Sequence, residues 1–150
     1  MAYPYKKMTE EDFDQIRSFT AKDRVWVGDE IAKEYYHDEM PEYGSYPPEL
    51  YVEVINKEDV SATMAYANQE NIPVGCRGAG TGLAGGATCK HGGIMLSVMR
   101  MNRIFPVDHK NQTITAEPGA LLVDIQAAAS AEGLFYPPDP GEKTASIGGN

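Results

Sequence analysis

The residues best suited to bind a ligand are the glycines that crowd the stretch IPVGCRGAGTGLAGGA at positions 72–87. A loop without side chains lets a ligand approach the backbone, and glycine adopts the positive φ that turns consecutive N–H groups toward one anion. Arg77 and Thr81 add side-chain donors to this loop. The loop therefore predicts an anion-binding nest, which a pyrophosphate would suit, while a tight turn packed under a neighbouring element stays the open alternative.

Two helix-based phosphate cradles fit this loop poorly. Gly80, Gly82 and Gly85 satisfy the G-x-G-x-x-G spacing, but GATCKHGGI runs into another strand where that fingerprint needs a helix. A P-loop is disfavoured because Gly86 and Ala87 stand where Lys and Ser or Thr are required. A Rossmann-type nucleotide-binding domain remains a third alternative, which a helix starting near Gly85 would revive.

The remaining reactive side chains indicate no second site. The histidines are scattered, at His37, His91 and His109, and the two cysteines lack the spacing of a zinc site or a disulfide framework. We expect no metal site, and we interpret Cys76 and Cys89 as reduced thiols with packing roles. The acidic segment around His37, Asp38 and Glu39 is interpreted as a solvated face.

Length and charge limit the class of protein. The 150 residues suffice for one domain, and 22 acidic against 13 basic residues give a formal net charge of -9. Nucleic acid and anionic membranes would repel such a chain. No apolar run is long enough for a membrane span, and the N-terminus lacks the apolar stretch of a signal peptide. We therefore expect a soluble, cytoplasmic protein.

Periodicity predicts the elements that position the loop. A helix is expected at about 10–19 behind Thr9, a short strand at 25–27, and then an irregular arm. A strand at 50–55, a helix capped by Asn56 with Val60, Met64 and Ala67 on one face, and a strand at 72–76 form a βαβ unit with parallel strands.

Three β-like runs follow the loop, at 93–98, 103–108 and 113–118, before a helix at about 121–132 that Gly133 closes. The predicted fold class is α+β: a βαβ unit followed by a mixed sheet with flanking helices. The glycine loop would leave the carboxyl end of a parallel strand, where α/β sheets commonly bind ligands.

Four stretches together carry a family resemblance: IPVGCRGAGTGLAGGA, GGIMLSVMRMNRI, ITAEPGALLVDIQ and GLFYPPDPGEKTASIGGN. In this order they resemble the FAD-binding domain of the PCMH type, in the FAD-linked oxidase group that contains the glycolate oxidase flavin subunit and D-lactate dehydrogenases. The resemblance implies that residues 46–150 are the N-terminal part of such a domain, incomplete at its C-terminus. Residues 1–45 would form an N-terminal helix and irregular arm.

The resemblance also implies which residues contact FAD. The loop residues matching the pyrophosphate-binding segment are Arg77, Gly78, Ala79, Gly80, Thr81, Gly82 and Leu83. The residues matching a second contact region are Pro138, Asp139, Thr144, Gly148, Gly149 and Asn150. Family members with covalent flavin often carry a histidine in this loop, and its absence here implies noncovalent FAD. Cys76 is interpreted as a small buried residue at a strand end and not as a flavin link.

The implied function is the FAD-binding portion of a 2-hydroxy-acid dehydrogenase or oxidase of the glycolate or D-lactate type. Hydride would pass from the substrate α-carbon to flavin N5, and electrons would then pass to an electron-transfer flavoprotein or an iron–sulfur subunit. The substrate domain is expected outside these residues, so no catalytic residue is assigned. The alternative is a non-catalytic half-domain that binds FAD weakly, or only with its missing half or a partner subunit. Exposed sheet edges would then favour self-association.

Overall fold

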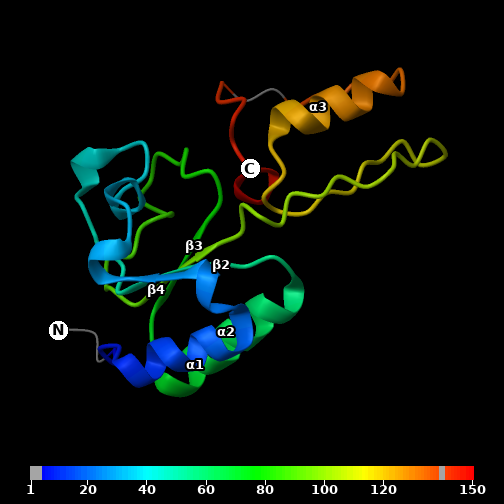
Figure 1. The fold of residues 1–150 in the computed structure, drawn as a ribbon. Coiled ribbons are helices and arrows are strands. Elements are labelled where there is room, and N and C mark those ends of the chain that lie inside the picture. Colours follow the sequence, from blue (N-terminus) through cyan, green and yellow to red (C-terminus); the bar gives the residue numbers. More distant parts are fainter. Residues whose placement is uncertain (1–4, 139–140) are drawn as a thin grey trace.

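The computed structural model describes residues 5–138 and 141–150. Its centre is a four-stranded mixed sheet in the order β1-β2-β4-β3 (Figure 1). The strands are β1 (Val25–Val27), β2 (Leu50–Glu53), β3 (Val74–Arg77) and β4 (Ile94–Ser97). Strands β2, β4 and β3 are parallel, and β1 pairs antiparallel with β2 at the edge. The predicted α+β class is confirmed.

The predicted βαβ unit forms, with one difference in strand order. Strands β2 and β3 are parallel, as predicted, and α2 (Lys57–Glu70) connects them. They are not neighbours, because β4 lies between them: Ile94 pairs with Leu50 on one side and with Val74 on the other. The three parallel strands therefore end at one edge of the sheet, and the glycine loop leaves from that edge.

Helix α2 begins where the sequence predicts. The Asn56 side chain accepts a hydrogen bond of 2.8 Å from the backbone N–H of Asp59, as an N-cap does. The helix buries Thr63 and Ala67, with Val60 half-buried beside them. The prediction that Met64 belongs to the buried stripe is wrong, since Met64 is 46% exposed. The preceding residue, Thr63, is buried in its place.

Helix α1 (Glu10–Thr20) lies beside α2 and is tied to it by the buried Asp12 carboxylate. Asp12 accepts hydrogen bonds from the backbone and hydroxyl of Thr9, from Lys6 Nζ at 2.6 Å and from the Tyr66 hydroxyl at 2.6 Å. Desolvation alone would raise the pKa of Asp12, but these hydrogen bonds outweigh it and lower that pKa to about 2. One carboxylate thus joins the start of α1 to α2.

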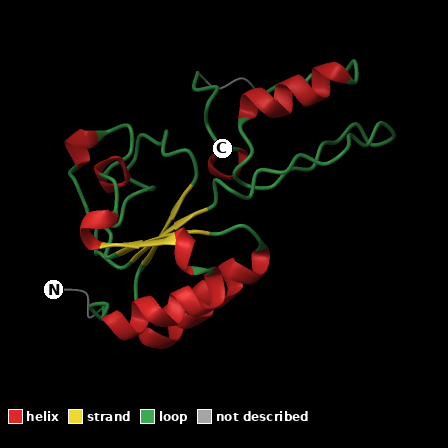
Figure 2. Ribbon diagram, viewed as in Figure 1, coloured by secondary structure: helices red, strands yellow, loops and turns green. Residues whose placement is uncertain are grey.

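The alternating side chains of the sheet enter two separate cores. Leu50, Val52, Ile94 and Leu96 pack toward α1 and α2. The residues between them, including Tyr51 and Met95, pack on the other face against Ile31, Trp26, Tyr35 and Tyr36 of the N-terminal segment. Figure 2 shows α1 and α2 on one side of the sheet and this segment, with its short helical turns, on the other.

The segment at 28–45 is less irregular than predicted. It forms three 3₁₀ turns, at Gly28–Glu30, Lys33–Tyr36 and Pro41–Tyr43. Because β1 belongs to the central sheet and this segment covers one of its faces, elements from both sides of residue 45 share the same packing. The division into regions 1–45 and 46–150 remains a prediction.

The C-terminal part extends away from the sheet as a long hairpin beside α3 (Leu122–Ala131) (Figure 1). The predicted strands at 103–108 and 113–118 are wrong as regular strands, because they meet only through the isolated bridges Ile104–Ala116 and Asp108–Thr113. Gly133 closes α3 as predicted, with φ of 72°, and the N–H of Leu134 bonds the Ala129 carbonyl. A last 3₁₀ turn spans Ile147–Gly149.

The segment after Gly85 tests the Rossmann alternative, which requires a helix to start there. Residues 85–93 form turns and no helix, and the chain then enters β4. Without a helix N-terminus beyond the third glycine, a Rossmann pyrophosphate site is excluded. Among the helices in the described ranges, none has the length and apolar character needed to cross a membrane.

Candidate functional site

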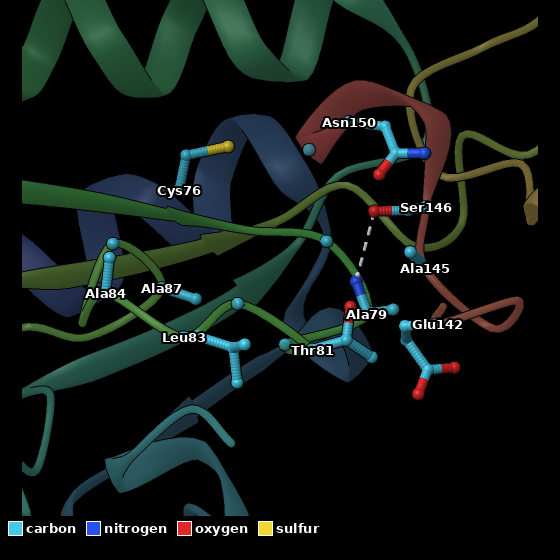
Figure 3. Close-up of a pocket in the computed structure, with 15 residues that line it drawn as sticks. Cys76, Ala79, Thr81, Leu83, Ala84, Ala87, Glu142, Ala145, Ser146 and Asn150 are labelled. Carbon is cyan, nitrogen blue, oxygen red and sulfur yellow. Dashed lines mark hydrogen bonds between the residues drawn. The ribbon is translucent and has the colours of Figure 1, made fainter. Parts of the chain in front are cut away.

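A cavity of about 400 Å³ opens where β3 ends, and Figure 3 shows its walls. One wall is the glycine loop with Cys76 at the end of β3, and the other is the segment 142–150. The lining residues are Cys76, Gly78, Ala79, Gly80, Thr81, Gly82, Leu83, Ala84, Gly86, Ala87, Glu142, Ala145, Ser146, Gly149 and Asn150. Its size lies within the range of small-molecule sites, and its position is the one at which α/β sheets bind ligands.

The loop wall contains backbone N–H groups that have no acceptor among the residues the structure describes. Ala79 N–H donates to Ser146 Oγ at 3.2 Å, and Gly85 N–H donates to Asp38 at 2.6 Å. Between these two points, no group in the described part of the chain accepts a hydrogen bond from the N–H of Gly80, Thr81, Gly82 or Leu83. Consecutive N–H groups without a partner in the described residues can donate to an anion, so this wall fits a pyrophosphate.

The glycines of the loop serve two purposes. A Cβ on Gly78 would collide with Ser146 Oγ, and a Cβ on Gly80, where φ is 79°, would lie 2.5 Å from Arg77 Cζ. Tight packing, the simpler alternative, therefore explains these two positions. It does not explain Gly86, where a Cβ would meet nothing within 4 Å, or Gly82, where the nearest atom is at 3.8 Å. Those two glycines leave the cavity open to a ligand.

The guanidinium of Arg77 joins the glycine loop to the N-terminal segment through hydrogen bonds. Arg77 is buried and donates to the carbonyls of His37 at 2.8 Å and of Ala87 and Glu34 at 3.3 Å each. Its Cζ lies 5.5 Å from the centre of the Tyr35 ring. The side chain of Arg77 does not line the cavity. The sequence suggested Arg77 as a side-chain donor to the ligand, but its guanidinium donates to carbonyls of the chain instead.

The interpretation of the acidic segment as a solvated face is wrong for Asp38. This side chain is 3% exposed, and it accepts hydrogen bonds from the N–H groups of Gly85 and Met40. His37 contributes its carbonyl to Arg77, while Glu39 is exposed. Composition could not reveal this, because one partner of Asp38, Gly85, is 47 residues away in the sequence.

The structure brings part of the second predicted contact region to the cavity. Gly149 and Asn150 line it, opposite the glycine loop. Gly148 does not line it: its N–H donates to the Pro118 carbonyl at 2.9 Å, and a Cβ there would lie 2.6 Å from Pro118 Cβ. Gly148 is therefore placed by packing against the end of the hairpin.

Two other predicted contacts, Pro138 and Thr144, lie outside the cavity wall. The Thr144 hydroxyl and backbone N–H both donate to the Glu142 carboxylate, which lowers the Glu142 pKa. The Pro138 carbonyl accepts a hydrogen bond of 3.4 Å from the Gln126 side chain on α3. Asp139 falls outside the residues that the structure describes.

Sequence reasoning overlooked two polar groups of the cavity. Ser146 belongs to the quoted stretch TASIGGN, and its buried hydroxyl joins the two walls (Figure 3). Cys76, interpreted above as buried, is exposed to the cavity. Partial desolvation raises the pKa of the Cys76 thiol, which disfavours the nucleophilic thiolate. Strand alternation could have indicated Cys76, because Arg77 occupies the opposite, buried face.

Fold and site together define a PCMH-type FAD-binding domain. A family model described as an FAD binding domain matches residues 48–150, and the chain belongs to that family. FAD is therefore its cofactor, and the open N–H groups at 80–83 fit the pyrophosphate of that molecule.

Curated relatives are similar over most of this chain. A D-lactate dehydrogenase from Anaerostipes hadrus is 45% identical over 148 residues, covering 99% of this chain and 31% of the relative. Glycolate oxidase subunit GlcD from Bacillus subtilis is 37% identical over 117 residues, covering 77% of this chain and 25% of the relative. The chain thus spans less than a third of the length of these relatives.

Solved structures share the fold at low sequence identity. An alkyldihydroxyacetonephosphate synthase has a TM-score of 0.82 at 18% identity, covering 97% of this chain and 32% of its own. A p-cresol methylhydroxylase with bound substrate has a TM-score of 0.78 at 21% identity, covering 95% and 29%. These likenesses concern the arrangement of the backbone.

Proposed function

We propose that this chain is the FAD-binding portion of a flavin-dependent 2-hydroxy-acid dehydrogenase or oxidase of the D-lactate or glycolate type. The observation that carries the proposal is the loop at 78–83, which lines a cavity in a chain of the FAD-binding family and whose N–H groups at 80–83 have no acceptor in the described residues. The names of the two relatives above support the substrate class.

FAD, when bound, supplies the acceptor for the hydride that leaves the α-carbon of the hydroxy acid. The residues of this chain bind and orient it. Backbone N–H groups at 80–83 hold the pyrophosphate without adding side-chain charge, while Gly149 and Asn150 face it from the opposite wall. No acid or base is assigned here, so substrate binding and deprotonation belong to the longer protein in this proposal.

Three further statements belong to the proposal. FAD is held noncovalently, because Cys76 is the one cysteine lining the cavity, its thiol is kept protonated, and the described lining contains no histidine. Electrons pass from the enzyme to an electron-transfer flavoprotein or an iron–sulfur subunit. The protein works in the cytoplasm.

The first test is a titration of the 150-residue chain with FAD, followed by flavin fluorescence. We expect saturable binding that Gly80→Val abolishes, because valine would collide with Arg77 at a positive φ. Gly141→Val is the matched control, since a Cβ there meets nothing within 4 Å. Gly82→Val, which has more room, keeps the test informative if Gly80→Val fails to fold. Equal binding by all these variants would contradict the cradle.

The alternative is a half-domain that binds FAD weakly or only beside further chain or a partner subunit. The coverage of the relatives, less than a third, is the observation behind it. A folded chain that does not bind FAD, together with a longer polypeptide that does, would favour this alternative. Failure of both to bind would refute the proposed function.

Noncovalent attachment predicts release of the flavin on denaturation. Precipitation of the FAD-loaded protein with acid should leave the yellow chromophore in the supernatant. The same treatment of a Cys76→Ala variant should release the same amount. Flavin that stays with the wild-type pellet but not with the Cys76→Ala pellet would identify a thioether link instead.

A further inference from the structure

The segment at 34–39 contacts the glycine loop through its backbone. The carbonyls of Glu34 and His37 accept hydrogen bonds from Arg77, whose guanidinium lies beneath Gly80. The Glu39 N–H donates to the Gly82 carbonyl at 3.2 Å. These contacts fix the start and the middle of the loop to one stretch of chain that precedes it by about forty residues.

Asp38 provides the side-chain contact in this set. Its Oδ2 accepts a hydrogen bond of 2.6 Å from Gly85 N–H, and its Oδ1 accepts one of 3.0 Å from Met40 N–H. Because both oxygens are engaged and the residue is 3% exposed, the side chain has one arrangement. Asp38 therefore holds the far end of the loop, where φ at Gly85 is 74°.

A buried carboxylate next to a loop that binds an anion is energetically unfavourable for two reasons. Removing its charge from water is unfavourable, and its negative charge would repel a pyrophosphate nearby. The charge-assisted hydrogen bond to Gly85 is correspondingly strong and short. Asp38 accepts the Gly85 N–H, whereas the N–H groups of the cavity-lining residues Gly80, Thr81, Gly82 and Leu83 have no acceptor in the described part of the chain.

We propose that Asp38 is a positioning residue of the FAD site, which holds Gly85 so that the loop at 80–83 presents its N–H groups to the pyrophosphate. This inference rests on the proposed function and deepens it, because it adds a residue from the N-terminal segment that acts through the loop. Asp38 does not line the cavity and needs no contact with the ligand.

The test compares three variants of the chain, or of a longer polypeptide that contains it. Asp38→Ala removes the acceptor, while Asp38→Asn keeps an oxygen acceptor without the charge. Glu39→Ala is the matched control, since it also removes one acidic side chain but from an exposed neighbour whose backbone bond to Gly82 remains. The readouts are the Kd for FAD, the Kd for ADP, which carries the adenosine and the diphosphate without the flavin, and the exchange rate of the Gly85 amide by NMR.

We expect Asp38→Ala to raise both Kd values by about tenfold and to accelerate Gly85 exchange, and Glu39→Ala to resemble wild type. Asp38→Asn should have an intermediate effect, because it keeps one oxygen acceptor where the aspartate uses two. If Asp38→Ala fails to fold, the Kd values and the Gly85 exchange rate of Asp38→Asn test the inference instead. Unchanged Kd values and Gly85 exchange in folded variants would overturn the inference while wild-type binding still supports the proposed function. Absence of FAD binding by both the wild-type chain and the longer polypeptide would instead refute the proposed function, and Gly85 exchange would still report whether Asp38 holds the loop.

Discussion

At the scale of single residues, Ser146 joins the two walls of the cavity. Its hydroxyl oxygen accepts from Ala79 N–H, and its own hydrogen remains available to a ligand. Gly78 has no side chain because a Cβ would occupy the place of this hydroxyl. Gly78 and Ser146 lie far apart in the sequence, but the Ser146 hydroxyl fits only because residue 78 has no side chain.

Ser146→Ala should therefore weaken FAD binding. The variant leaves Ala79 N–H unpaired and removes a donor from the cavity, for which we expect an increase in Kd of about fivefold to tenfold. Isothermal titration calorimetry checks this value. Ser130→Ala on the exposed face of α3 removes an equivalent hydroxyl away from the cavity and should bind like wild type. An unchanged Kd for Ser146→Ala would show that the hydroxyl does not act on the ligand.

At the scale of elements, the Asp12 network determines how α1 sits on α2. The lowered pKa of Asp12, about 2 against an ordinary 3.8, means that its charged form is stabilised by folding. This stabilisation is fully present above about pH 4 and is lost as the pH falls toward 2. Between the two helices, the Tyr66 hydroxyl of α2 donates to Asp12 of α1, and Lys6 Nζ donates to both Asp12 and Glu70 of α2.

Asp12→Asn should make stability less dependent on pH in this window. At pH 7 we expect a loss of about 2 kcal/mol in the free energy of unfolding, and between pH 4 and 2 a flatter curve than wild type. Urea unfolding at several pH values measures both. Asp14→Asn, on the exposed side of the same helix, is the control and should follow wild type. Parallel curves for Asp12→Asn and wild type would contradict the assignment.

At the scale of the whole molecule, the hairpin and α3 extend beyond the sheet and carry exposed apolar surface. Phe135 is 81% exposed beside a groove lined by Val107, Ile114, Leu134 and others. The hairpin leaves much of its backbone outside a regular ladder, as its two isolated bridges show. Such a surface favours contact with a second copy of the chain.

We expect the chain to self-associate through this surface. Sedimentation velocity should show a mass that increases with protein concentration, and Phe135→Ser should shift the protein toward monomer. Met64→Ser, which removes an exposed apolar side chain from α2, should not have this effect. A wild-type chain that stays monomeric at all concentrations would refute this prediction.

Local features of the sequence predicted much of this molecule. The N-cap at Asn56, the closing Gly133 and the alternation of the β-like runs predicted where helices and most strands lie. The runs at 103–108 and 113–118 were predicted as strands but do not form a regular ladder. Their apolar pattern does not indicate whether two runs pair along their length. Met64 was misplaced because helical spacing fits more than one face, and only packing on the sheet selects among them.

Local residue patterns were enough to predict the glycine loop, its place after a strand and the family to which it belongs, since these depend on residues near one another in the chain. Three features required the folded structure: β4 lies between β2 and β3, Asp38 and Arg77 support the loop, and Ser146 joins the two walls of the cavity. Ala79 and Ser146 are 67 residues apart, and Asp38 and Gly85 are 47 apart. Contacts over such separations depend on how whole elements pack, which no local pattern of residues encodes.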